Sequence, residues 1–68
     1  MQQGTIKNVT TKGYGFISRE GENKDLFFHS SELKNARFDE LKAGDRVEFE
    51  VGSGERGPFA ANIYVLEN

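Results

Sequence analysis

The sequence predicts an all-β domain: a small closed antiparallel barrel of five short strands, spanning residues 1–68. Three observations favour this fold class. Five short apolar or aromatic runs are separated by turn residues, which is typical of strands. No run is long enough for a substantial helix. The pattern of apolar residues also leaves no apolar sheet face exposed, so the sheet is expected to close on itself.

Residues 4–9 are predicted to form the first strand, with Ile6 inward and Lys7 outward. Val9 has the wrong parity to share the face of Ile6. We therefore expect a bulge near Asn8 if both apolar side chains are buried. Thr10 and the residues that follow it form the turn into the second strand.

Residues 12–17 and 25–29 are aromatic, bounded by turn residues and joined by a polar linker, which predicts a β-hairpin. The alternation of faces favours one register, in which Ile17 pairs with Leu26 and Phe16 with Phe27. Ile17, Leu26 and Phe28 then face the core. The opposite face, which should be solvated, carries four rings instead: Tyr14, Phe16, Phe27 and His29.

Residues 30–33 are expected to form a short helical turn capped by Ser30, with Leu33 folding back onto the core. Residues 34–45 show no sustained period, and Leu41 is their best core candidate. Phe38 has two possible places, in the core or at the edge of the ring face.

Residues 46–51 and 59–66 alternate and predict the last two strands. A glycine-rich loop joins them. The side chains expected to point inward are Val47, Phe49 and Val51 in the first of these strands and Ala61, Ile63 and Val65 in the second.

The composition argues against several classes of function. Cysteine is absent, which excludes a disulfide framework and a thiolate zinc site. The single histidine, His29, has no evident nucleophile, carboxylate or metal-ligand partner, so we expect neither an enzyme nor a bound metal or cofactor. The first residues are not an apolar run, so we expect no signal peptide, no membrane span and a cytoplasmic location.

The charge balance is slightly acidic, with 9 Lys and Arg against 11 Asp and Glu and a net charge of −2. Nucleic-acid binders are usually basic, so the net charge alone does not predict one. Lys7 and Lys12 nevertheless flank the ring-bearing strands, and Arg56 lies in a loop that can approach them. The alternative is that these cations are solvated charges at strand edges.

The rings of Tyr14, Phe16 and Phe27 have two interpretations: a cross-strand cluster that stabilises the hairpin, or a platform on which bases stack. The platform is favoured because the opposite face already supplies a core. His29 is interpreted in the same way, as a stacking ring or a structural residue. Phe59 either adds a ring to the platform or caps the end of the barrel.

Three segments in order resemble the cold-shock domain family: Lys12-Gly13-Tyr14-Gly15-Phe16-Ile17, Leu26-Phe27-Phe28-His29 and the run from Arg56 to Ile63. The resemblance covers essentially the whole chain. It implies an oligonucleotide-binding (OB) barrel that binds single-stranded RNA and DNA with little sequence preference, and a role as RNA chaperone or antiterminator in the stress response. The residues that match the family's binding surface are Lys7, Lys12, Tyr14, Phe16, Phe27, His29 and Phe38, with Gly57 and Pro58 in the loop that approaches the bases.

The chain departs from the family pattern at four positions. Asn8 stands in place of a surface tryptophan, Val9 in place of phenylalanine and Ser30 in place of an aromatic residue. Phe59 stands where the family has a small or amide residue, and so restores one ring. Each lost platform is expected to weaken binding by about 1–3 kcal/mol.

The sequence thus predicts a single-strand nucleic-acid binder, monomeric and without membrane or metal partners. In this hypothesis, bases stack on the rings while Lys7 and Lys12 hold the backbone. The alternative is a protein-interaction module, or a homodimer, that uses the same ring patch.

Overall fold

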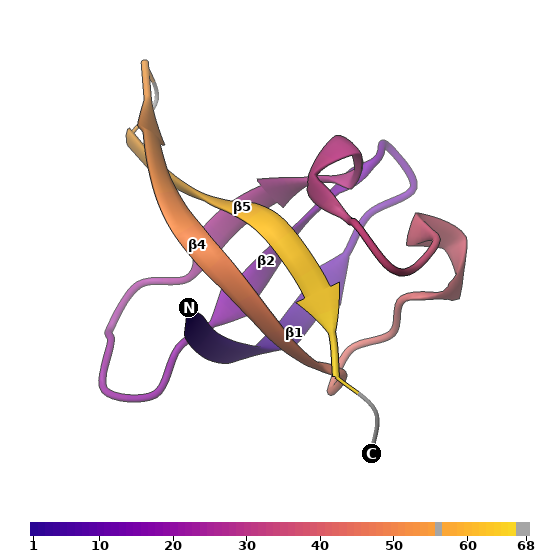
Figure 1. Ribbon diagram of the computed structural model, residues 1–68, viewed down its shortest axis with the longest axis horizontal. Helices are drawn as coiled ribbons and strands as arrows, with labels where there is room; N and C mark the ends of the chain where they lie inside the picture. Colours follow the sequence, from indigo (N-terminus) through magenta and orange to yellow (C-terminus); the bar gives the residue numbers. More distant parts are fainter. Residues whose placement is uncertain (56, 67–68) are drawn as a thin grey trace.

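The computed structural model describes residues 1–55 and 57–66, which form a closed barrel of five strands (Figure 1). The predicted all-β barrel is therefore confirmed. Two 3₁₀ turns, η1 (Ser30–Glu32) and η2 (Phe38–Glu40), lie between the third and fourth strands. The strands are β1 (Gln2–Val9), β2 (Tyr14–Ser18), β3 (Leu26–His29), β4 (Arg46–Gly54) and β5 (Gly57–Val65).

The barrel closes in the order β1-β2-β3-β5-β4, with β4 pairing back onto β1. Every neighbouring pair is antiparallel except β3 and β5, which run parallel at Phe27 and Phe59. The prediction of an antiparallel barrel is wrong at this one seam. The reason is geometric, because strand directions cannot alternate all the way around a closed ring of five.

The hairpin of β2 and β3 has the predicted register. Tyr14 pairs with His29, Phe16 with Phe27 and Ile17 with Leu26. The core lies on the other face of this hairpin and collects inward side chains from every strand. Its buried apolar residues are Ile6, Ile17, Leu26, Phe28, Leu41, Val47, Phe49, Ala60 and Ile63.

The predicted bulge in β1 is confirmed. The pairing with β2 shifts between Ile6 and Asn8, which inserts one extra residue at Lys7. Ile6 is buried and Lys7 is exposed, as predicted, and Val9 packs against the core. The bulge is what allows Ile6 and Val9 to share the core face despite their spacing.

A second bulge, in β5, was not predicted. Glu48 pairs with Tyr64 but Glu50 pairs with Ala61, and Asn62 has a φ of 50°. The extra residue reverses the parity of β5, so Ala60 is fully buried and the prediction that Ala61 points inward is wrong.

Val51 is 40% exposed, which corrects its predicted inward position. Past this point, β4 and β5 extend beyond the other strands as a two-stranded ribbon of residues 53–54 and 57–58 (Figure 1). We call this segment the β4–β5 ribbon. Val51 lies close to its start, so alternation there no longer implies burial.

His29, and not Ser30, caps the turn η1, because its ring nitrogen accepts the backbone N–H of Ser31. Leu33 bridges Ile63 and packs against the core, and Leu41 is buried as predicted. Phe38 also packs against the core, with its ring centroid 6.2 Å from that of Phe28.

Candidate nucleic-acid interface

Three of the predicted rings form one contacting cluster on the outer face of the β2–β3 hairpin. The centroids of Tyr14 and Phe27 are 5.6 Å apart, those of Phe16 and Phe27 6.1 Å, and those of Tyr14 and Phe16 6.2 Å. We call Tyr14, Phe16 and Phe27 the ring trio. All three side chains are half-buried. The rings therefore support one another from the sides while their remaining surface faces solvent.

The neighbouring position on β1 is polar. Asn8 pairs with Phe16 and is exposed. An aromatic side chain at this place would extend the ring trio across a third strand. The aromatic surface therefore ends at the amide on this flank.

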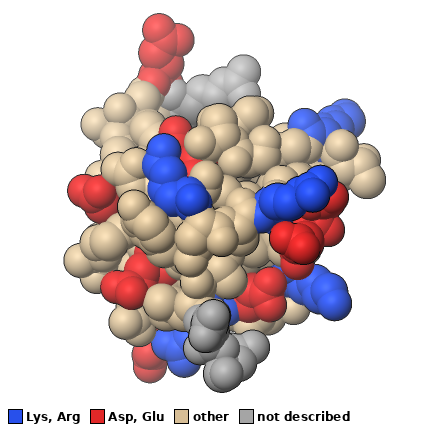
Figure 2. Space-filling model, turned by 45° about the vertical axis from the view of Figure 1, so that its right-hand side comes forward, with Lys and Arg blue, Asp and Glu red and all other residues tan. Residues whose placement is uncertain are grey.

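The charges around the barrel are mixed. Figure 2 shows basic and acidic side chains interspersed on the face that it draws, with neither sign gathered in one patch. Glu48 and Glu50 lie on β4 and pair with β5. Among the described residues, Lys7 and Lys12 are the cations predicted to border the ring trio.

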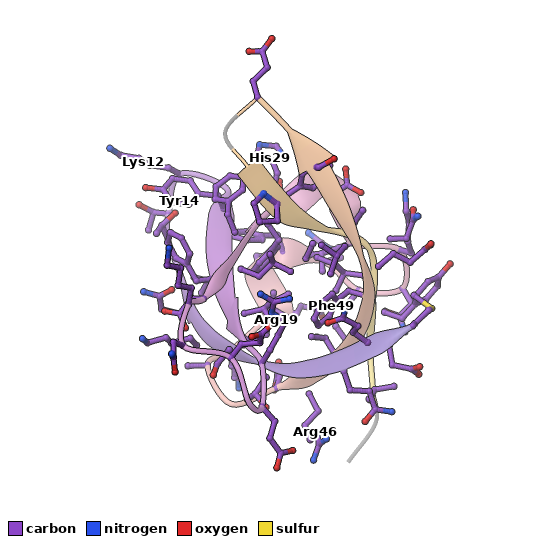
Figure 3. All side chains as sticks on the ribbon, turned by 90° about the vertical axis from the view of Figure 1, so that its left-hand side faces the viewer. Lys12, Tyr14, Arg19, His29, Arg46 and Phe49 are labelled. Carbon is purple, nitrogen blue, oxygen red and sulfur yellow. The ribbon has the colours of Figure 1, made fainter. Side chains whose placement is uncertain are left out.

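Lys12 is exposed in the turn between β1 and β2. Hydrogen bonds within this turn stabilise its conformation. The backbone N–H and the hydroxyl of Thr10 both donate to the carbonyl oxygen of Tyr14, each with a donor–acceptor distance of 2.9 Å. Gly13 completes the turn with a φ of 95°, a conformation that a residue with a Cβ rarely adopts. Figure 3 shows Lys12, Tyr14 and His29 at the same end of the molecule, from which the β4–β5 ribbon projects.

His29 pairs with Tyr14 in the register but is tied to η1 through its ring. Its Nδ1 accepts the backbone N–H of Ser31 at 3.1 Å and lies 3.0 Å from the Ser31 hydroxyl. A nitrogen that accepts an N–H carries no proton, so in the neutral ring the proton is on Nε2. The exposed imidazole therefore offers Nε2–H as an oriented donor beside the ring trio.

Lys7 is already paired. Its Nζ donates to Asp25 Oδ2 at a distance of 2.8 Å. This ion pair links β1 to the residue just before β3. Both side chains are partly solvated, and such a surface pair is worth only about 0–1 kcal/mol. A phosphate can therefore compete for Lys7 at small cost.

Gly57, Pro58 and Phe59 begin β5, and Phe59 is the partner of Phe27 across the parallel seam. The structure thus places Phe59 beside the ring trio and not at the end of the barrel. Phe38 contacts Phe28 and not the ring trio. Arg56 lies outside the described residues.

Sequence reasoning missed two residues of this region. Asp25 pairs with Lys7, and its position just before a ring-bearing strand was the available signal. Gly52 lies beneath Phe59, where a Cβ would come within 2.8 Å of the ring. A glycine that interrupts an alternating strand signals such a close approach.

Within the described residues, no group of three or more His, Asp or Glu side chains is placed to hold a metal ion. The same part of the chain contains no helix that is long and apolar enough to cross a membrane.

Comparison with known proteins identifies relatives over nearly the whole chain. Residues 2–66 match the "Cold-shock" DNA-binding domain family. The chain is 49% identical over 67 residues to the cold shock protein CspA of Staphylococcus saprophyticus, which covers 97% of this chain and 100% of that protein. CspA of Staphylococcus aureus gives the same identity and coverage.

A solved structure of Drosophila Unr CSD456 superposes with a TM-score of 0.79 at 34% sequence identity. The match covers 97% of this chain and 26% of the Unr chain. The barrel described above is therefore the fold of these cold-shock domains.

Proposed function

Because the chain belongs to the "Cold-shock" DNA-binding domain family, a nucleic-acid-binding family and not an enzyme family, we propose that it binds single-stranded RNA and DNA through the ring trio. The bases stack on Tyr14, Phe16 and Phe27, and binding has little sequence preference. Every base has a π-face, so stacking of this kind does not require a particular base.

One observation carries this proposal: three contacting rings occupy the face of the hairpin that is not needed for the core. Phe28, on the other face, is fully buried. A cluster that served only stability would be expected to face the barrel interior, where burial of apolar surface contributes most.

The polar residues around the rings hold the strand in place. Lys12 contacts phosphate from its exposed turn, and Lys7 does so when it releases Asp25. His29 stacks or donates from Nε2 at the edge of the platform. Arg56, Gly57, Pro58 and Phe38 are included in the proposed interface on the resemblance to the family.

A protein that holds unpaired bases competes with base pairing. Binding then melts weak RNA secondary structure without ATP, which is the action of an RNA chaperone or antiterminator. The absence of cysteine from the chain fits a reducing compartment, and we place the activity in the cytoplasm.

The test is a titration of a labelled oligo-pyrimidine, first single-stranded and then as a duplex. The parent should bind the single strand saturably and the duplex weakly. The double variant Phe16→Ala, Phe27→Ala should bind the single strand at least about 30-fold more weakly, since each stacked base contributes about 1–3 kcal/mol. Tyr64→Ala removes an exposed aromatic side chain from the outer face of β5 and is the matched control.

The competing proposal is a protein-interaction module or homodimer that uses the same rings, and the net charge of −2 is the observation that favours it. It predicts a mass that rises with concentration in light scattering and no binding of either strand at low salt. Unchanged single-strand binding by the double variant would remove the ring trio from the mechanism.

A further inference from the structure

A cavity of about 450 Å³ lies between β3 and the start of the β4–β5 ribbon. Its lining is mostly apolar and consists of Phe27, Gly54, Glu55, Gly57, Pro58 and Phe59. Phe27 and Phe59 are partners across the parallel seam, so their side chains leave the sheet on the same face. Among the described residues, the contacting ring pairs include Phe27 but not Phe59, which leaves open space between these two rings.

Gly52 determines where the ring of Phe59 lies. The two residues are paired between β4 and β5. A Cβ at Gly52 would stand 2.8 Å from the Phe59 Cζ and 3.1–3.2 Å from both Cε atoms. The ring therefore packs directly on the backbone of Gly52 in β4. Any larger residue at position 52 would displace the ring from this contact.

We propose that this cavity, which we call the ring slot, takes one further nucleobase of the strand bound on the ring trio, in contact with Phe27 and Phe59. This inference rests on the proposed function and deepens it. The volume lies within the range of about 300–1,000 Å³ that is usual for small-molecule sites. The apolar lining suits the flat face of a base.

Two features favour a base of the same strand over other occupants. Phe27 belongs both to the ring trio and to the ring slot, so a strand that crosses the trio brings its next base to the cavity. The lining is mostly apolar, so it accepts the face of a base more readily than the charged backbone, whose desolvation is costly. Phe59 therefore lengthens the footprint by one nucleotide.

The experiment measures affinity against the length of an oligo-pyrimidine strand, from about three nucleotides upward, for the parent and for Phe59→Ala. On strands long enough to reach the ring slot, Phe59→Ala should bind about 5- to 150-fold more weakly, as expected for one lost stacking contact. On shorter strands the two proteins should bind alike. The salt dependence should be the same for both, because stacking releases no counterions.

Gly52→Ala supplies a second, independent arm. It should weaken the binding of long strands in the parent by displacing the ring, yet have no further effect when combined with Phe59→Ala, because the Cβ then meets no ring. Phe59→Trp keeps a flat ring, so its affinity should still increase with strand length as it does in the parent. Tyr64→Ala, on the outer face of the same strand, should bind like the parent.

The outcomes separate the two proposals. If the parent binds no single strand, the proposed function itself is wrong. If the parent binds but Phe59→Ala matches it at every length, only the ring slot is wrong. Circular dichroism monitors folding, and should Phe59→Ala be unfolded, Phe59→Leu replaces it, since it keeps apolar bulk without a flat face and has the same two outcomes.

Discussion

Phe27 and Phe28 are adjacent residues of the same type with opposite roles. Phe28 is fully buried in the core, and Phe27 stands half-buried in the ring trio. Successive side chains of a strand point to opposite faces, so position alone separates them. At the scale of the residue, burial here depends on the face of the strand and not on residue type.

The ion pair between Lys7 and Asp25 gives a prediction at the same scale. Asp25→Asn removes the competitor of the phosphate, so single strands should bind more tightly at low salt, by up to about fivefold. The log–log salt slope should steepen by up to about 0.7, the value for one added phosphate contact on a single strand. A salt titration by fluorescence anisotropy measures both quantities.

Glu48→Gln, which changes the net charge equally on β4, is the control and should leave the slope unchanged. An Asp25→Asn protein with the parental slope would mean that Lys7 does not contact the backbone. Lys7→Gln should weaken binding and make the slope shallower.

At the scale of the element, the bulge in β5 decides which residues are buried. Asn62 has a φ of 50°, donates its side-chain amide to Glu50 at 2.9 Å and its backbone N–H to Glu32 at 3.2 Å. These contacts hold a conformation that other side chains adopt at a cost of about 1–2 kcal/mol. The bulge turns Ala60 inward and brings the N-terminal half of β5 alongside β3.

Asn62→Ala should therefore destabilise the barrel by about 1–2 kcal/mol, which lowers Tm by roughly 5–15 °C in a domain of this size. Asn62→Gly loses the same side-chain hydrogen bond without the backbone strain, so its Tm should lie between those of the parent and Asn62→Ala. Thermal unfolding followed by circular dichroism ranks the three proteins. Equal Tm values for the alanine variant and the parent would show that the bulge is unstrained.

At the scale of the whole molecule, a slightly acidic barrel must bind a polyanion with few cations. Lys7 and Lys12 are the described cations of the proposed interface, with Arg56 added from the sequence. Stacking on the ring trio is therefore expected to provide most of the affinity.

The salt dependence of binding measures directly how the affinity is divided between stacking and phosphate contacts. Single strands should bind with a log–log slope of only about −0.7 to −2, which corresponds to one to three phosphate contacts. Titrations at several salt concentrations give the slope. A value of about −4 or steeper would mean that phosphate contacts dominate and that the rings are secondary.

The sequence predicted the hairpin and its ring face because both are local. Only one register placed Ile17 and Leu26 in the core together, and the structure has that register. The parity of Val9 likewise predicted the bulge in β1. Both inferences needed nothing beyond the period of a strand and the need to bury apolar side chains.

The wrong predictions concern contacts between distant segments. The parity of β5 and the inward position of Ala61 were wrong because the Asn62 bulge leaves the alternating pattern intact in the sequence. Val51 was misplaced because alternation does not tell where a strand leaves the barrel. The cap of η1 was assigned one residue too late, since an imidazole nitrogen took the role expected of a hydroxyl.

The sequence by itself therefore determined the class of fold, the family, the ring trio and the faces of the first three strands, since strand period and motif spacing are properties of contiguous residues. Only the tertiary structure decided the parallel seam of β3 and β5, the place of Phe59 beside Phe27 and its contact with Gly52. A closed ring of five strands must contain at least one parallel pair, but which strands form it depends on pairing between distant parts of the chain. That pairing creates the ring slot, and no local pattern in the sequence specifies it.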